Sequence, residues 1–148
     1  MQQPIDGILE APYVMEYTYR RSLGPVMSAY FTALREGRLL GARTASGSLV
    51  VPPLEWDPAT GAAIAGLEQV AETGTITACT WVATPAARHL LQTPFAYALI
   101  RLDGADTAML HAVACESAEA CKVGSRVQLV WAEQRTGTVR DISHFKLI

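Results

Sequence analysis

The stretch PFAYALIRLDGADTAMLHAVA, residues 94–114, contains two apolar runs that meet at a turn. The runs at 95–103 and 107–114 both have the length and composition of β-strands. Asp103-Gly104 lies between them, and such a pair favours a tight turn because glycine readily adopts positive φ. The stretch therefore predicts a β-hairpin. Residues 96–100 are apolar at every position, so we expect both faces of this strand to be buried, one of them under a covering element.

Further strands are predicted on both sides of this hairpin. They are rich in β-branched and apolar residues and span residues 74–84, 126–134 and 139–147. Residues 117–120 have the composition of one helical turn between the third and fourth strands. Five strands with a short helix after the third are typical of a small closed Greek-key barrel of the OB type. We assign residues 67–148 to this barrel, in a mainly β protein.

A short helix is predicted upstream, over residues 25–36. Pro25 suits a first helical position, where its missing N–H has no helical partner to lose. Apolar residues at positions 26, 30 and 34 then recur at helical spacing, and Gly37 suits a left-handed cap after the last turn.

Between this helix and the barrel, residues 38–53 predict a small hairpin that ends at Pro52-Pro53. A second turn follows at Asp57-Pro58-Ala59-Thr60-Gly61, where the aspartate side chain can accept backbone N–H groups. We group residues 19–66 as a helix-plus-hairpin module. Residues 1–18, which show little periodicity, are expected to form an extended arm.

This order of elements resembles the domain of unknown function 35 (DUF35) family, in which a rubredoxin-like zinc ribbon precedes an OB-fold. The family's ribbon has a CxxCG knuckle, a Pro-Pro pair and a CPxCG knuckle. Residues 43–47, RTASG, fit the first knuckle, and residues 57–61, DPATG, fit the second. Three barrel segments also resemble the family, at residues 74–76, 94–104 and 123–127.

The four positions that hold cysteines in the family are Arg43, Ser46, Asp57 and Thr60 here. A structural zinc needs about four nitrogen, sulfur or oxygen ligands in a tetrahedron, and only Asp57 is a good ligand. We therefore expect a degenerate ribbon that binds no zinc and lacks the roughly 10 kcal/mol that such a metal contributes. Asp57 is expected to cap its own turn. Whether Arg43 pairs with it is left open.

Aromatic residues gather in the first 31 residues, and two interpretations remain open. The helix could simply cover the ribbon and the mouth of the barrel. Alternatively, these side chains form a protein–protein surface, because Tyr, Phe, Met and Arg are favoured at interface centres. The expected interface residues are Tyr19, Arg20, Met27, Tyr30, Phe31 and Leu34.

A ligand groove on the barrel is a further possibility, lined by Trp81, Arg88, His89 and Phe95. OB barrels bind nucleic acid through aromatic residues and a basic groove. The formal net charge is −2, however, and neither half of the chain is basic. We therefore expect no nucleic-acid partner.

Signatures of an independent enzyme are missing from the sequence. It has no GxSxG, P-loop or GxGxxG motif, and its histidines and three cysteines show no metal-ligand spacing. Cys79 is expected to be a small core residue. The N-terminal sequence lacks a signal-peptide pattern, and no apolar run approaches about 18 residues, so we expect a cytoplasmic protein with no membrane partner.

The resemblance implies a function. DUF35 proteins commonly bind thiolase-fold proteins that act on acyl-CoA substrates, and some pair with lipid-transfer-protein-like retro-aldolases of bacterial steroid side-chain degradation. We therefore expect a non-catalytic accessory subunit of a carbon–carbon lyase or acyltransferase complex, in which the partner holds most of the CoA ester. The alternatives are a stand-alone acyl-CoA-binding module and, less favoured by charge, a nucleic-acid-binding OB domain.

Overall fold

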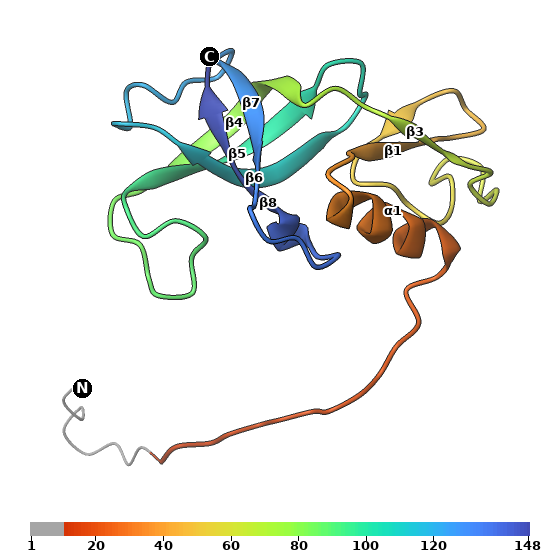
Figure 1. Ribbon diagram of the computed structural model, residues 1–148, viewed down its shortest axis with the longest axis horizontal. Helices are drawn as coiled ribbons and strands as arrows, with labels where there is room; N and C mark the ends of the chain where they lie inside the picture. The colour runs from red at the N-terminus through yellow and green to blue at the C-terminus, as the bar shows by residue number, and fades with distance from the viewer. Residues whose placement is uncertain (1–10) are drawn as a thin grey trace.

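The computed structural model describes residues 11–148, and the larger part of it is a closed β-barrel (Figure 1). Its strands are β4 (Thr73–Val82), β5 (Phe95–Leu102), β6 (Ala108–Ala114), β7 (Arg126–Trp131) and β8 (Ile142–Leu147). They follow the order β4-β5-β6-β8-β7; β6 and β8 pair in parallel and the other neighbours pair antiparallel. The predicted five-stranded OB-fold barrel is confirmed.

The central hairpin β5–β6 forms where the sequence predicts it, with Leu99 opposite Leu110. Gly104 in its turn has φ of 85°, which explains the glycine. The expected burial of both faces of β5 is wrong at Leu99, which is exposed. Residues on the inner face, such as Phe95 and Ile100, are fully buried. No element among the described residues covers the outer face at Leu99, so an apolar patch remains there.

The last strand begins at Ile142, three residues later than predicted, because a 3₁₀ helix, η1 (Val139–Asp141), precedes it. The Asp141 carboxylate accepts the backbone N–H groups of Thr136 at 2.9 Å and Gly137 at 2.7 Å. Burial opposes the ionisation of Asp141, but these hydrogen bonds outweigh it and hold its pKa below the usual range. The predicted helical turn at residues 117–120 is a hydrogen-bonded turn rather than a helix.

A three-stranded sheet precedes the barrel, in the order β2-β1-β3. Its strands are β1 (Leu40–Arg43), β2 (Leu49–Val50) and β3 (Leu67–Gln69). The β1–β2 pair is the predicted hairpin. β3 pairs with β1, so residues 67–69 belong to this sheet, although the sequence assigned them to the barrel. Hydrophobic burial against β1 explains the difference, since Leu67 packs against the core.

Helix α1 (Pro25–Arg35) lies beside both β1 and η1 (Figure 1). Its first turn is held by the Glu55 carboxylate, which accepts the N–H groups of Val26 at 3.3 Å and Met27 at 3.1 Å. The helix ends at the predicted glycine, because Gly37 has φ of 74° and donates its N–H to the Leu34 carbonyl. The predicted helix at 25–36 is therefore confirmed to within a residue.

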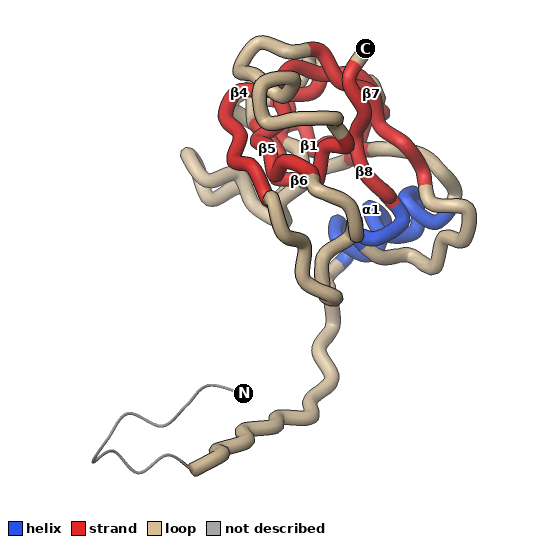
Figure 2. The backbone as a smooth tube through the Cα atoms, turned by 90° about the vertical axis from the view of Figure 1, so that its left-hand side faces the viewer, coloured by secondary structure: helices blue, strands red, loops and turns tan. Residues whose placement is uncertain are grey.

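Before α1, residues 11–24 form neither helix nor strand and extend away from the body of the protein (Figure 2). Residues 11–18 of the expected arm are therefore extended, as predicted. Residues 1–10 lie outside the described part of the chain. None of the helices within residues 11–148 is both long and apolar enough to cross a membrane.

Candidate partner-binding surface

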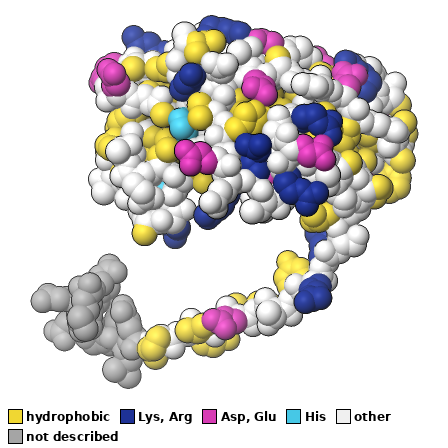
Figure 3. All heavy atoms as spheres, in the orientation of Figure 1, with side chains coloured by type: hydrophobic (Ala, Val, Ile, Leu, Met, Phe, Trp, Pro, Cys, Tyr) yellow, Lys and Arg dark blue, Asp and Glu magenta, His cyan; other side chains and the backbone are white. Residues whose placement is uncertain are grey.

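The arm carries the most exposed aromatic side chains of the described chain. Tyr13, Tyr17 and Tyr19 are 84%, 78% and 81% exposed, and Arg20 is exposed as well. Figure 3 shows hydrophobic side chains recurring along the arm, well separated from the body of the protein. Large exposed apolar side chains in such a segment favour a role in protein–protein contact. Tyr19 and Arg20, predicted at an interface, are therefore available for one.

Helix α1 divides the remaining predicted interface residues into two groups. Tyr30 and Leu34 are 2% and 0% exposed, so their assignment to an interface is wrong. They lie on the helical stripe that faces the core, and burial raises the pKa of Tyr30 to about 12. Met27 and Phe31 are partly buried at the edge of this stripe and remain partly accessible.

An apolar hollow of about 220 Å³, which we call the helix–barrel hollow, lies between α1 and the barrel. It is lined by Met27, Tyr30, Phe31, Pro52, Met109, Leu110, His111, Val139 and Ile142. His111 is buried, and burial lowers the pKa of its imidazole, so the ring is neutral at pH 7. Leu110 and Val139 at its rim are strongly exposed. The hollow thus presents a neutral, apolar surface.

A second hollow of about 220 Å³, the barrel-face hollow, lies over β4, β5 and β6. It is lined by Ala78, Cys79, Thr80, Tyr97, Leu99 and Leu110. Leu110 borders both hollows, so they form one continuous apolar surface. Cys79, expected in the core, is exposed here, and its thiol donates to the Cys121 carbonyl at 3.2 Å.

The predicted ligand groove does not form around its four residues. Phe95 is fully buried and cannot line an open groove, because its side chain fills the barrel core. His89 packs its ring edge-on against Phe95, with ring centroids 5.6 Å apart, and accepts the Ala86 N–H at 3.0 Å. Arg88 is exposed, and Trp81 is partly buried against the core. His89 therefore orders its loop.

The two knuckle-like turns are joined by a carboxylate. Asp57 is 1% exposed; its Oδ1 atom accepts the N–H of Ala59 at 2.8 Å and its Oδ2 atom accepts the N–H of Ser46 at 3.1 Å. The Ala59 hydrogen bond holds the pKa of Asp57 below its usual value against the effect of burial, and Ser46 and Thr60 add to this lowering. The predicted capping role of Asp57 is confirmed, and the carboxylate also reaches the other turn.

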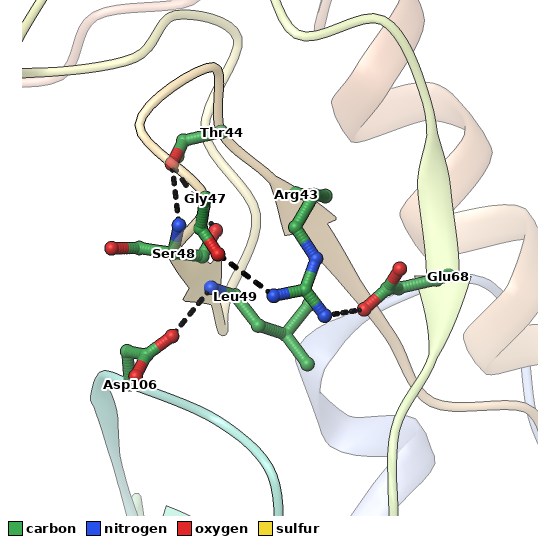
Figure 4. Close-up of polar contacts among 7 residues, drawn as sticks. All are labelled: Arg43, Thr44, Gly47, Ser48, Leu49, Glu68 and Asp106. Carbon is green, nitrogen blue, oxygen red and sulfur yellow. Dashed lines mark hydrogen bonds and ion pairs between the residues drawn. The ribbon is translucent and has the colours of Figure 1, made fainter.

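Arg43 pairs with a different carboxylate (Figure 4). Its guanidinium donates to the Gly47 carbonyl at 2.8 Å and forms an ion pair with Glu68. Because β3 pairs with β1, Glu68 lies close to Arg43, which answers the question left open by the sequence. The same view shows the Asp106 carboxylate accepting the Leu49 N–H at 2.7 Å, which ties the ribbon to the β5–β6 turn of the barrel.

Comparisons with known proteins assign a family to the barrel. Residues 67–132 match the family model of the ChsH2 C-terminal OB-fold domain. A chain of the Ltp2-ChsH2(DUF35) aldolase has the same fold, with a TM-score of 0.63 and 21% identity over 86% of this chain and 97% of that one. Residues 67–132 therefore belong to the ChsH2 OB-fold domain family, and the chain shares the fold of a DUF35 protein.

A second DUF35 protein, one of unknown function from Sulfolobus solfataricus, also shares the fold. Its TM-score is 0.60 at 16% identity, over 84% of each chain. No curated protein matches the sequence significantly. In this chain, no group of three or more His, Cys, Asp or Glu within residues 11–148 is arranged to hold a metal ion.

Sequence reasoning missed the residues of the apolar surface on this barrel. Leu99 and Leu110 were assigned to strands but not to a site. Their cross-strand pairing depends on the register of β5 and β6, which the sequence does not specify. The fully apolar run at residues 96–100 was the available signal, because its outer face needs a partner.

Proposed function

We propose that this chain is a non-catalytic accessory subunit of a thiolase-fold acyl-CoA enzyme, a retro-aldolase of bacterial steroid side-chain degradation. The observation that carries the proposal is the shared fold with a chain of the Ltp2-ChsH2(DUF35) aldolase, which extends over nearly all of that chain. The ChsH2 family match of the barrel supports the same assignment.

The uncovered apolar surface supports a hetero-complex. Leu110 is 63% exposed and lies between the two hollows, with Leu99 and Val139 also exposed nearby. Interface centres are depleted in charged residues and enriched in aromatic residues and methionine, and Met27, Phe31 and Tyr97 border this surface. A lipid-transfer-protein-like subunit is the partner that we assign to it.

In this role the chemistry belongs to the partner. A retro-aldolase cleaves the bond between the α and β carbons of a β-hydroxyacyl-CoA, and the thiolase fold would supply the acid–base groups and most of the CoA site. This chain would order the partner's surface without a zinc ion. Its Asp57 carboxylate holds the ribbon together through the hydrogen bonds to Ser46 and Ala59.

Co-expression tests the proposal. The full chain should co-purify with the lipid-transfer-protein-like thiolase homologue of the same genome and migrate with it as one species in size-exclusion chromatography with light scattering. Leu110→Asp should abolish the complex. Val123→Asp is the matched control, because Val123 is 66% exposed but lies in the turn before β7, outside both hollows.

Two results would overturn the proposal. One is a wild-type chain that stays separate from every such homologue. The other is tight binding of CoA esters by the isolated chain in a calorimetric titration, which would favour a stand-alone acyl-CoA-binding module.

A further inference from the structure

The arm has a two-residue periodicity that the proposed function does not explain. Tyr13, Met15, Tyr17 and Tyr19 stand at alternate positions, and Val14, Glu16 and Thr18 fall between them. Successive side chains of an extended strand point to opposite faces, so this spacing places the four apolar residues on one face. The pattern is that of a half-buried β-strand, not of a random linker.

The geometry of the arm agrees with this pattern. The Tyr17 hydroxyl donates to the Met15 sulfur at 3.3 Å, so these two side chains lie on the same side of the extended backbone. Met15 is 61% exposed, and the three tyrosines are exposed still more. Within residues 11–148, nothing packs over this face.

The backbone of the arm is equally unpaired. Among the described residues, no backbone–backbone hydrogen bond involves residues 11–23, and the first one upstream of the ribbon joins Ser28 to Gly24 inside the helix. A segment with free N–H and C=O groups and one apolar face can add to the edge of another sheet. The main chain then supplies the affinity and the alternate side chains supply the specificity.

The edges of this chain's own sheets do not suit the arm. The barrel is closed, and the free edges of the ribbon sheet are β2, with two residues, and β3, with three. A strand spanning Tyr13 to Tyr19 would extend well past either edge. Within residues 11–148, a second copy of the chain offers the same short sheet edges and an arm that belongs to no sheet, so we assign the sheet to a different protein.

We infer that residues 13–19 bind the partner subunit as an added β-strand. The partner site is a free sheet edge beside an apolar groove that receives Tyr13, Met15, Tyr17 and Tyr19, with acidic residues at the end that meets Arg20 and Arg21. The inference rests on the proposed function for the identity of the partner. It adds an attachment point that is separate from the hollows on the barrel.

Hydrogen exchange and affinity measurements on the complex test the inference. Amide exchange of residues 13–19 should slow on binding the lipid-transfer-protein-like homologue. Tyr13→Ser/Tyr17→Ser/Tyr19→Ser should weaken binding at least tenfold, and Thr18→Pro, which removes a backbone donor, should also weaken it. The matched controls are Thr18→Ala and Val14→Ser, which change the other face and should alter binding less than threefold. All variants should melt as the wild type does, because the substituted side chains are exposed and nothing within residues 11–148 packs on them.

The outcomes separate the two proposals. A complex that forms while residues 13–19 exchange freely and the triple variant binds normally overturns the arm inference and leaves the proposed function standing. The absence of any wild-type complex overturns both. Self-association of the isolated chain that the triple variant abolishes would assign the arm to a second copy, and would overturn the assignment to a different protein.

Discussion

The Oδ2 atom of Asp57 accepts the backbone N–H of Ser46 at 3.1 Å, which joins two turns that are 11 residues apart in sequence. In the DUF35 ribbon frame, these residues occupy two of the positions where the family has cysteines. A hydrogen-bonded carboxylate therefore links the two turns.

Replacement of Asp57 tests this link. Asp57→Ala should lower the melting temperature by several degrees at pH 7, because it leaves the N–H groups of Ser46 and Ala59 without an acceptor. Asp57→Asn should have a smaller effect, since its amide oxygen can still accept one hydrogen bond.

The stability that Asp57 provides should also depend on pH. The folded pKa of Asp57 is lowered, so its contribution to the free energy of unfolding is complete above the unfolded pKa of about 3.9 and is lost as the pH falls through the folded pKa. Thermal melting between pH 7 and pH 2 should show a larger loss in the wild type and in the exposed-surface control Glu133→Gln than in Asp57→Asn, which keeps only the losses from other carboxylates such as Asp141.

Metal content gives a second prediction. The purified chain should contain less than a stoichiometric amount of zinc by elemental analysis, and EDTA should not change its melting temperature. The combined substitution Arg43→Cys, Ser46→Cys, Asp57→Cys and Thr60→Cys should bind one zinc ion per chain, because it restores four thiolate ligands in the family's frame. One zinc per wild-type chain would contradict the account of the ribbon.

The corrected roles of the helix residues give a third prediction. Leu34→Ala should lower the free energy of unfolding by about 3 kcal/mol, because Leu34 is fully buried and its truncation leaves a cavity. Leu23→Ala, in the exposed segment before the helix, should change it by less than about 0.5 kcal/mol. Urea unfolding measures both. Equal effects would show that α1 does not pack as described.

The buried imidazole of His111 gives a fourth prediction. Burial lowers its folded pKa below the ordinary value of 6.5, so the unfolded chain takes up a proton that the folded chain resists. The free energy of unfolding should therefore fall as the pH decreases from 7 to 5. His111→Leu should reduce this slope. An unchanged slope in His111→Leu would contradict a buried neutral ring.

The helices and strands were largely predictable from the sequence, whereas the burial and the partners of individual side chains were less predictable. The strand pattern at residues 94–114 and the helical spacing from Val26 to Leu34 are local signals, and both elements formed where expected. The ion-pair partner of Arg43 depends on tertiary packing. The burial of Tyr30, in contrast, agrees with its place on the apolar stripe that it shares with Val26 and Leu34. η1 has a local sequence signal as well, since Thr138 and Asp141 form a capping box.

The exposed surface was predictable only in part. Tyr19 and Arg20 in the arm are accessible, as an interface requires, whereas Leu99 and Leu110 emerged only from the strand register. A fully apolar strand can be covered by an element of its own chain or by another protein, and the sequence of one chain does not distinguish these cases. Here the described residues leave the outer face at Leu99 uncovered.

The most direct test of the central claim is an activity titration with the full chain. The lipid-transfer-protein-like homologue of the same genome is held at fixed concentration, and cleavage of a steroid β-hydroxyacyl-CoA is followed as this chain is added. The account predicts that cleavage rises with added chain, saturates at a fixed molar ratio, and does not rise with the Leu110→Asp variant. Full cleavage by the homologue alone, unchanged by any amount of this chain, would contradict it.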